Sequence, residues 1–125
     1  MTDVHAIAHD MVAMTKAGDF HIGEKYWADD VVSIEAAPGP MARVEGRDAV
    51  MAKSAWWYGA HEVHGTTTAG PFINGDRIAI HWTMDVTNKE AGQRIQMDEV
   101  ALSTIRDGRI VEEQFFYDMP VAPAA

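Results

Sequence analysis

The 125-residue sequence contains no cysteine, few basic residues and no long apolar run. Without cysteine, a disulfide framework, a thiol nucleophile and a cysteine-ligated zinc site are all excluded. No apolar stretch approaches the ~18 residues that cross a membrane. The first residues, "MTDVHAIAHD", also lack the basic and apolar segments of a signal peptide. We therefore expect a cytoplasmic protein without a membrane partner.

Positively charged residues are scarce. Ten lysines and arginines stand against nineteen aspartates and glutamates, which gives a net charge of −9. Such a field repels a phosphate backbone, so nucleic acid is not an expected partner and a small apolar or neutral ligand is favoured. The length suits one domain over residues 1–125, and the proline- and alanine-rich residues 119–125 predict a loose C-terminal tail.

Apolar spacing predicts three helices in the first half of the chain. In residues 3–17 the apolar side chains recur every three or four positions, with Asp3 as a plausible N-cap and Gly18 at the end. Residues 20–27 predict a short second helix, and residues 47–59 carry a third apolar face.

Alternating patterns predict the sheet. The stretch "YWADDVVSIEA" at 26–36 has the β-branched residues of a first strand. Three later turns, at Asn74-Gly75, 88–92 and Asp107-Gly108, separate four strands at about 63–73, 77–87, 94–105 and 109–118. Because helices come first and a meander comes last, we expect an α+β fold. Three N-terminal helices would pack on a curved, mainly antiparallel sheet and enclose a pocket.

The order of these elements resembles the NTF2-like superfamily, and within it the SnoaL-like and ketosteroid-isomerase-like proteins. The stretches that carry the resemblance are "AGDF", "YWADDVVSIEA", "VEGRDAV", "AGPFINGDRIAIHW" and "IRDGRIVEEQFFYD". The resemblance implies a cone-shaped fold with an internal pocket. It leaves the activity open, because this fold hosts isomerases, cyclases, hydrolases, dehydratases and binding modules.

The resemblance also gives Glu35 a candidate role. In ketosteroid isomerases a "YADD" turn leads into a strand that delivers an aspartate as general base, and that position falls on Glu35. The tyrosine and the protonated aspartate of the same enzymes fall on Met11 and on or next to Val100. Without these two donors a dienolate lacks its main stabilisation, so ketosteroid isomerase activity itself is not expected.

Strand alternation predicts which side chains face the hollow. The register that the resemblance implies turns Asp98 and Val100 inward, whereas a single β-bulge would turn Glu99 inward instead. Asp98 and Glu113 could also lie near strand ends and reach water, and the aromatic residues could simply form the core. The predicted lining consists of Trp27, Trp57, Ile80, Trp82, Met84, Val100, Glu113 and Phe115, together with the polar Glu35, Asp98 and Tyr117.

The stretch "HEVH" at 61–64 resembles the zinc motif HExxH with one residue missing. Zinc needs two histidines four apart on a helix, whereas these are three apart at the start of a predicted strand. We expect no metal there, although His61 or His64 could serve as an acid/base partner near the pocket mouth. The chain also lacks a glycine-rich phosphate loop, so no cofactor is expected.

Two functional hypotheses follow. The first is a cofactor-independent acid/base enzyme of the isomerase, cyclase, dehydratase or hydrolase type acting on a small, largely apolar molecule. In it Glu35 takes or relays a proton, while Asp98 and Tyr117 position the substrate or a water. The second is a non-catalytic module for ligand binding or dimerisation.

A homodimer joined through the outer sheet face is also expected. Alternation and the implied register predict a flat, lysine-free outer face of small, mildly polar and aromatic residues. Its members are His81, Thr83, Glu99, Ala101, Ser103, Gln114 and Phe116.

Overall fold

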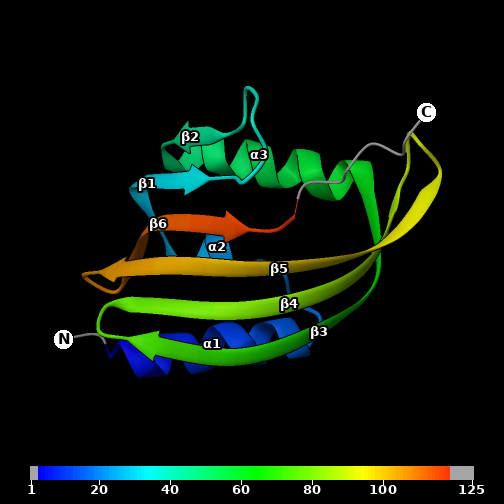
Figure 1. Cartoon of the computed structure of the whole chain (residues 1–125). Coiled ribbons are helices and arrows are strands. Elements are labelled where there is room, and N and C mark those ends of the chain that lie inside the picture. Colours follow the sequence, from blue (N-terminus) through cyan, green and yellow to red (C-terminus); the bar gives the residue numbers. More distant parts are fainter. Residues whose placement is uncertain (1–2, 119–125) are drawn as a thin grey trace.

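A computed structural model describes residues 3–118, and the predicted loose tail at 119–125 lies outside this range. The chain has the predicted α+β architecture, with three helices packed on one six-stranded sheet (Figure 1). In chain order the elements are α1 (Val4–Lys16), α2 (Ile22–Tyr26), β1 (Trp27–Ile34), β2 (Arg43–Glu45), α3 (Arg47–Ala60), β3 (His61–Asn74), β4 (Arg77–Asn88), β5 (Gln93–Arg106) and β6 (Arg109–Phe116).

The sheet has the strand order β2-β1-β6-β5-β4-β3. Strands β3 to β6 form the predicted antiparallel meander, and β1 joins it by pairing parallel to β6. The short β2 was not predicted, because its three residues lie next to a Pro/Gly-rich segment and are too few to show alternation. The long strands curve so that α1 packs against β3 and β4, while α3 packs against β1 (Figure 1).

Helix α1 begins and ends where the sequence predicts. The Asp3 side chain caps the first turn by accepting a hydrogen bond from the His5 amide at 2.9 Å. Gly18 follows the last turn with a φ of +81°, a conformation that glycine adopts without strain. The apolar stripe of this helix packs on the inner face of the sheet and is buried at Ile7, Ala8, Met11, Val12 and Thr15.

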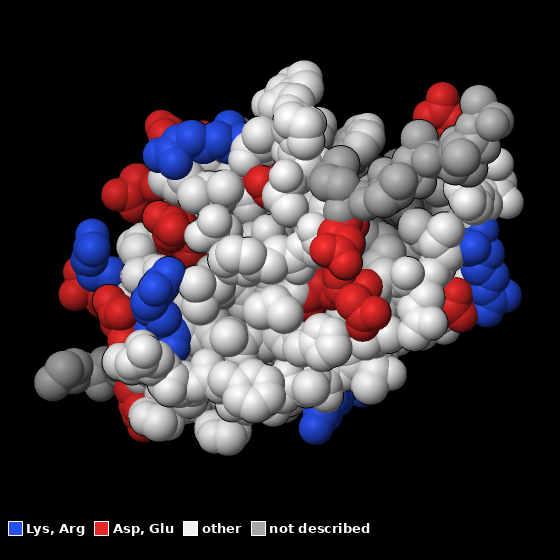
Figure 2. Space-filling model, viewed as in Figure 1, with Lys and Arg blue, Asp and Glu red and all other residues white. Residues whose placement is uncertain are grey.

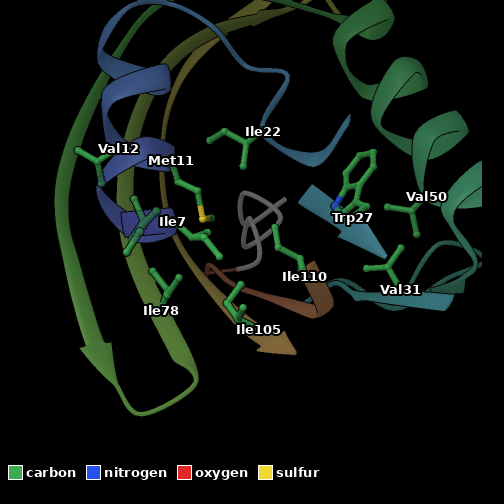
Figure 3. Close-up of a cluster of buried hydrophobic side chains, with 12 residues drawn as sticks. Ile7, Met11, Val12, Ile22, Trp27, Val31, Val50, Ile78, Ile105 and Ile110 are labelled. Carbon is green, nitrogen blue, oxygen red and sulfur yellow. The ribbon is translucent and has the colours of Figure 1, made fainter. Parts of the chain in front are cut away.

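The hydrophobic core is one cluster between the helices and the sheet, and it extends from α1 to α3 (Figure 3). At one side the α1 side chains pack with Ile78 of β4; at the other, Trp27 lies with Val31 and Val50 between β1 and α3. A Cβ atom on Gly23 would lie 2.0 Å from the Trp27 indole. Only glycine at position 23 therefore lets α2 approach this ring.

Strand β5 has the opposite register to the one that the resemblance implied. Its pairing with β4 runs without a bulge, with Trp82 opposite Glu99 and Thr83 opposite Asp98. Because directly opposed residues project to the same face, Glu99 lies inside with Trp82, and Asp98 lies outside with Thr83.

The predicted outer face is corrected accordingly. Ala101 and Ser103 are buried on the inner face and cannot belong to it. Their places are taken by Asp98, Val100 and Leu102, and β6 contributes Gln114 and Phe116, which pair with Leu102 and Val100. Figure 2 shows this side of the molecule with many uncharged residues, a group of acidic side chains near its middle and the lysines and arginines toward its margins.

Candidate active site

A cavity of about 1360 Å³ lies between the helices and the inner face of the sheet. Aromatic and aliphatic side chains make up most of its wall, and a small group of charged side chains lies among them. The aromatic members include Trp27, Trp57, Tyr58, Trp82, Phe115 and Tyr117, and the charged members include Glu35, Lys53, Glu99 and Glu113.

Glu35 lies at the end of β1 and is held from two sides. The Lys53 ammonium, on α3, lies 2.7 Å from Glu35 Oε1, and the two side chains are only 12% and 21% exposed. The Tyr117 hydroxyl donates to Glu35 Oε2 at 3.0 Å and accepts from the Ala37 amide at 3.3 Å. Burial and the Glu35 charge raise the Tyr117 pKa to about 12, so the phenol keeps the proton that it donates.

Glu113 of β6 is held deeper in the same array. Its Oε2 accepts from the Trp27 indole at 3.0 Å, and its Oε1 accepts from the Ser33 hydroxyl at 2.9 Å. Ser33 in turn accepts from Lys53 Nζ at 2.7 Å, so one ammonium contacts both carboxyl groups, Glu35 directly and Glu113 through a hydroxyl. Burial raises the pKa of Glu113, and the bonds from Trp27 and Ser33 and the charge of Lys53 oppose that rise.

Glu99 differs from the other two carboxyl groups. It lines the cavity, and within residues 3–118 it makes no side-chain hydrogen bond. Burial, followed by the negative charges of Glu35 and Glu113, raises the Glu99 pKa to about 7, and Lys53 opposes this only weakly. Near neutral pH this carboxyl can therefore either give or take a proton.

An aromatic group from α3 and its neighbours forms another part of the wall. The Trp57 ring stacks on His61 at 4.3 Å between centroids and meets Tyr58 edge to face at 5.1 Å. His61 Nδ1 lies 2.9 Å from the Trp57 carbonyl, so its ring is fixed at the cavity wall. His64 points away and bonds Thr87 at 2.7 Å.

Three predicted site residues lie elsewhere. The Asp98 side chain is 68% exposed on the outer face, where it accepts from Thr83 at 2.8 Å and pairs with His81 at 3.1 Å. Val100, 36% exposed, lies on the same outer face. Ile80 points inward but is fully buried in the hydrophobic core instead of lining the cavity. The other predicted members line the cavity: Glu35, Trp27, Trp57, Trp82, Met84, Glu113, Phe115 and Tyr117.

Two polar residues of the site were missed. Ser33 lies two residues before Glu35 on β1, and this spacing already places both side chains on one face. Lys53 lies three residues after Val50 and four before Trp57, which is the spacing of one helix face. Lys53 was not predicted from this spacing, because a charged lysine on a helix usually faces water.

The described part of the chain offers neither a cluster of metal ligands nor a membrane-spanning helix. Across residues 3–118 no group of three histidine, aspartate or glutamate side chains has a geometry that could hold a metal ion. No helix in that range is long and apolar enough to cross a membrane. The site as it stands offers a carboxylate fixed by a cation, a second carboxyl that titrates near neutrality, a neutral phenol and an aromatic wall.

Comparisons with known proteins agree on the fold. A SnoaL-like protein from Mesorhizobium loti, for which polyketide cyclase activity has been suggested, is 46% identical with a TM-score of 0.89, over 93% of this chain and 100% of that one. A suggested isomerase from Bacillus subtilis is 18% identical with a TM-score of 0.76, over 94% and 90% of the two chains. An NTF2-like protein of unknown function from Burkholderia pseudomallei K96243 is 19% identical with a TM-score of 0.71, over 94% and 92%.

No curated protein matches the chain. The family model of the SnoaL-like domain, by contrast, matches residues 1–117, which is nearly the whole sequence. This chain therefore belongs to the SnoaL-like family of the NTF2-like superfamily.

Proposed function

We propose that this protein is a cofactor-independent acid/base enzyme that isomerises, cyclises or dehydrates a small, largely apolar molecule. The observation that carries the proposal is the Glu99 carboxyl, which has no side-chain hydrogen bond within residues 3–118 and lies on the wall of an aromatic cavity with a pKa of about 7. A group whose pKa is close to the working pH is the most effective proton donor or acceptor.

The remaining residues take complementary roles. Glu99 in its neutral form donates a proton to an oxygen of the substrate, and Glu35 removes a proton from a neighbouring carbon. Each Glu35 oxygen accepts one hydrogen bond, and a carboxylate offers about four acceptor positions, so Glu35 retains free lone pairs. Tyr117 and Lys53 fix the direction of the base, and Trp57, Trp82 and Phe115 contact the apolar body.

The names of similar proteins support this reaction class. The Mesorhizobium loti protein carries a suggested cyclase activity and the Bacillus subtilis protein a suggested isomerase activity. Ring closure and isomerisation both need one proton delivered and one removed, without a redox step. Glu99 and Glu35 supply these two roles in one cavity.

The proposal is tested by proton exchange, which can be measured on simple compounds in place of the natural substrate. A panel of small neutral ketones, enones and epoxides is incubated with the protein in D₂O, and NMR follows binding and incorporation of deuterium next to the carbonyl. We expect at least one compound to exchange faster with the wild type than with Glu99→Gln or Glu35→Gln. Glu90→Gln, which removes a carboxylate from the exposed β4–β5 loop, is the matched control and should exchange as the wild type does.

The rival hypothesis is a non-catalytic binding module. It would be supported if compounds bound the cavity but exchanged at the same rate with the wild type, Glu99→Gln and Glu35→Gln. That result would overturn the enzymatic proposal.

A further inference from the structure

We propose that Lys53 is the positioning residue of the cavity: its ammonium fixes Glu35 and Glu113 as hydrogen-bond acceptors, so the mobile proton stays on Glu99. This inference rests on the proposed function, in which Glu99 is the proton donor. It adds a role for a side chain that neither the sequence pattern nor the family match assigns.

The directions of the hydrogen bonds carry the argument. Lys53 Nζ has only protons to give, and it lies 2.7 Å from both Glu35 Oε1 and Ser33 Oγ. Ser33 accepts from Lys53 and donates its own proton to Glu113 Oε1, 2.9 Å away. The Trp27 indole, which can only donate, occupies the other Glu113 oxygen. Both oxygens of Glu113 therefore accept a hydrogen bond from a neighbouring side chain.

The same ammonium fixes Glu35. With Oε1 held by Lys53 and Oε2 held by Tyr117, the carboxylate has one orientation, and the Tyr117 hydroxyl passes that constraint on to the Ala37 amide. Lys53 also lies 5.3 Å above the Phe115 ring, which limits its movement. The chain of contacts thus runs from buried Trp27 to the loop after β1, with Lys53 at its centre.

Within residues 3–118, Glu99 is the cavity carboxyl that does not take part in this hydrogen-bond network. The charged and titratable groups that act on it come from two elements and two strand ends: Glu113 on β6, Lys53 and Tyr58 on α3, Glu35 directly after β1, and Tyr117 directly after β6. The Lys53 ammonium contacts Glu35 directly and Glu113 through Ser33. Among the described contacts it makes no hydrogen bond to Glu99. Within residues 3–118 no side-chain donor reaches Glu99, so a proton on this carboxyl displaces no hydrogen bond.

The test replaces the charge and keeps the length of the side chain. In protein labelled with ¹³C at the glutamate carboxyl carbon, Lys53→Met should move the titrations of Glu99 and Glu113 to higher pH, by about one pH unit or more. Lys53→Arg, which retains the cation, should leave both within a few tenths of a pH unit of the wild type. Ser33→Ala should raise the titration of Glu113 and leave that of Glu99 unchanged. Lys16→Met, on the exposed end of α1, is the matched control.

A second signal reports on position. The Ala37 amide proton shift depends on the Tyr117 hydroxyl that Glu35 orients, so Lys53→Met should move this shift toward its value in Tyr117→Phe. A purely structural role for Lys53 would lower the melting temperature and leave the Ala37 shift and the order of titration as in the wild type. That result would overturn the inference. If Lys53→Met does not fold, Ser33→Ala and Lys53→Arg still decide it through Glu113.

The two proposals fail in different ways. If wild-type Glu99 titrates like an exposed glutamate, near ~4.3, the proposed function loses its acid. The Lys53 inference is then still decided by Glu113 and by Ala37. If Glu99 titrates near 7 but Lys53→Met changes neither Glu113 nor Ala37, the inference on Lys53 is wrong and the proposed function stands.

Discussion

Replacing Glu99 by glutamine should make the protein more stable at neutral and alkaline pH. In the folded chain the Glu99 pKa is about 7, against an ordinary value of 4.5. Between these two pH values the folded protein keeps a proton that the unfolded chain has released. The contribution of Glu99 to stability is therefore fully present below pH 4.5 and is lost as the pH rises through about 7.

The size of the effect follows from the shift. At about 1.4 kcal/mol for each pH unit, the free energy of unfolding falls by about 3 kcal/mol across this window and then stays level. The raised pKa of Glu113 acts in the same direction. Because the charges of Glu113 and Glu99 act on each other, the difference between wild type and Glu99→Gln reports Glu99 together with this coupling.

The assay is urea denaturation of the wild type, Glu99→Gln and the control Glu90→Gln at intervals from pH 4.5 to pH 8. We expect the free energies of wild type and Glu99→Gln to be similar at the acidic end and to separate as the pH rises, with Glu99→Gln the more stable. A difference that stays constant over the whole range would refute the reasoning, because it would show that Glu99 titrates alike in the folded and unfolded chains.

Two further predictions concern packing and assembly. Gly23→Ala should displace the Trp27 indole, change its fluorescence and destabilise the fold by about 1–3 kcal/mol, since a Cβ there would lie 2.0 Å from the ring; unchanged fluorescence and unchanged urea denaturation would contradict the packing argument. We also propose a homodimer through the outer sheet face, centred on the paired Val100 and Phe116, which are 36% and 47% exposed. Phe116→Asp should halve the mass seen by light scattering and Ile95→Asp, on the opposite face of β5, should not, whereas a monomeric wild type at micromolar concentration would exclude this interface.

Much of the fold could be predicted from local patterns. The 3.6-residue period located the helices, and the Asn74-Gly75 and Asp107-Gly108 turns located two hairpins, because these signals depend only on neighbouring residues. Alternation also placed Trp82 on the inner face, since the buried residues of β4 all belong to one alternating set. In β6 the pairing shifts near Ile105, and Glu113 lies inside because it is opposite the buried Ser103.

The register of β5 could not be predicted in the same way. Both alternating sets of this strand mix apolar with acidic residues, so burial alone does not distinguish Asp98 from Glu99. The resemblance supplied a register, and the uninterrupted pairing with β4 contradicts it. Counting across the hairpin from Asn88 and Gln93, which pair directly, gives the observed orientation.

The low content of basic residues explains the character of the site better than any single motif does. Among the described residues that line the cavity, Glu35, Glu99 and Glu113 act on one another with Lys53 as their shared cation, so they cannot all be ionised at low cost. Neutral donors partly replace the missing cations. The Trp27 indole and the Ser33 hydroxyl donate to Glu113, and the Tyr117 phenol donates to Glu35. The first two donors and Lys53 oppose the rise that burial causes in the pKa of Glu113, whereas Glu99 holds a proton up to about pH 7. On this argument the proton that the proposed chemistry needs is a consequence of the charge imbalance, and adding a second cation beside Glu99 should remove it.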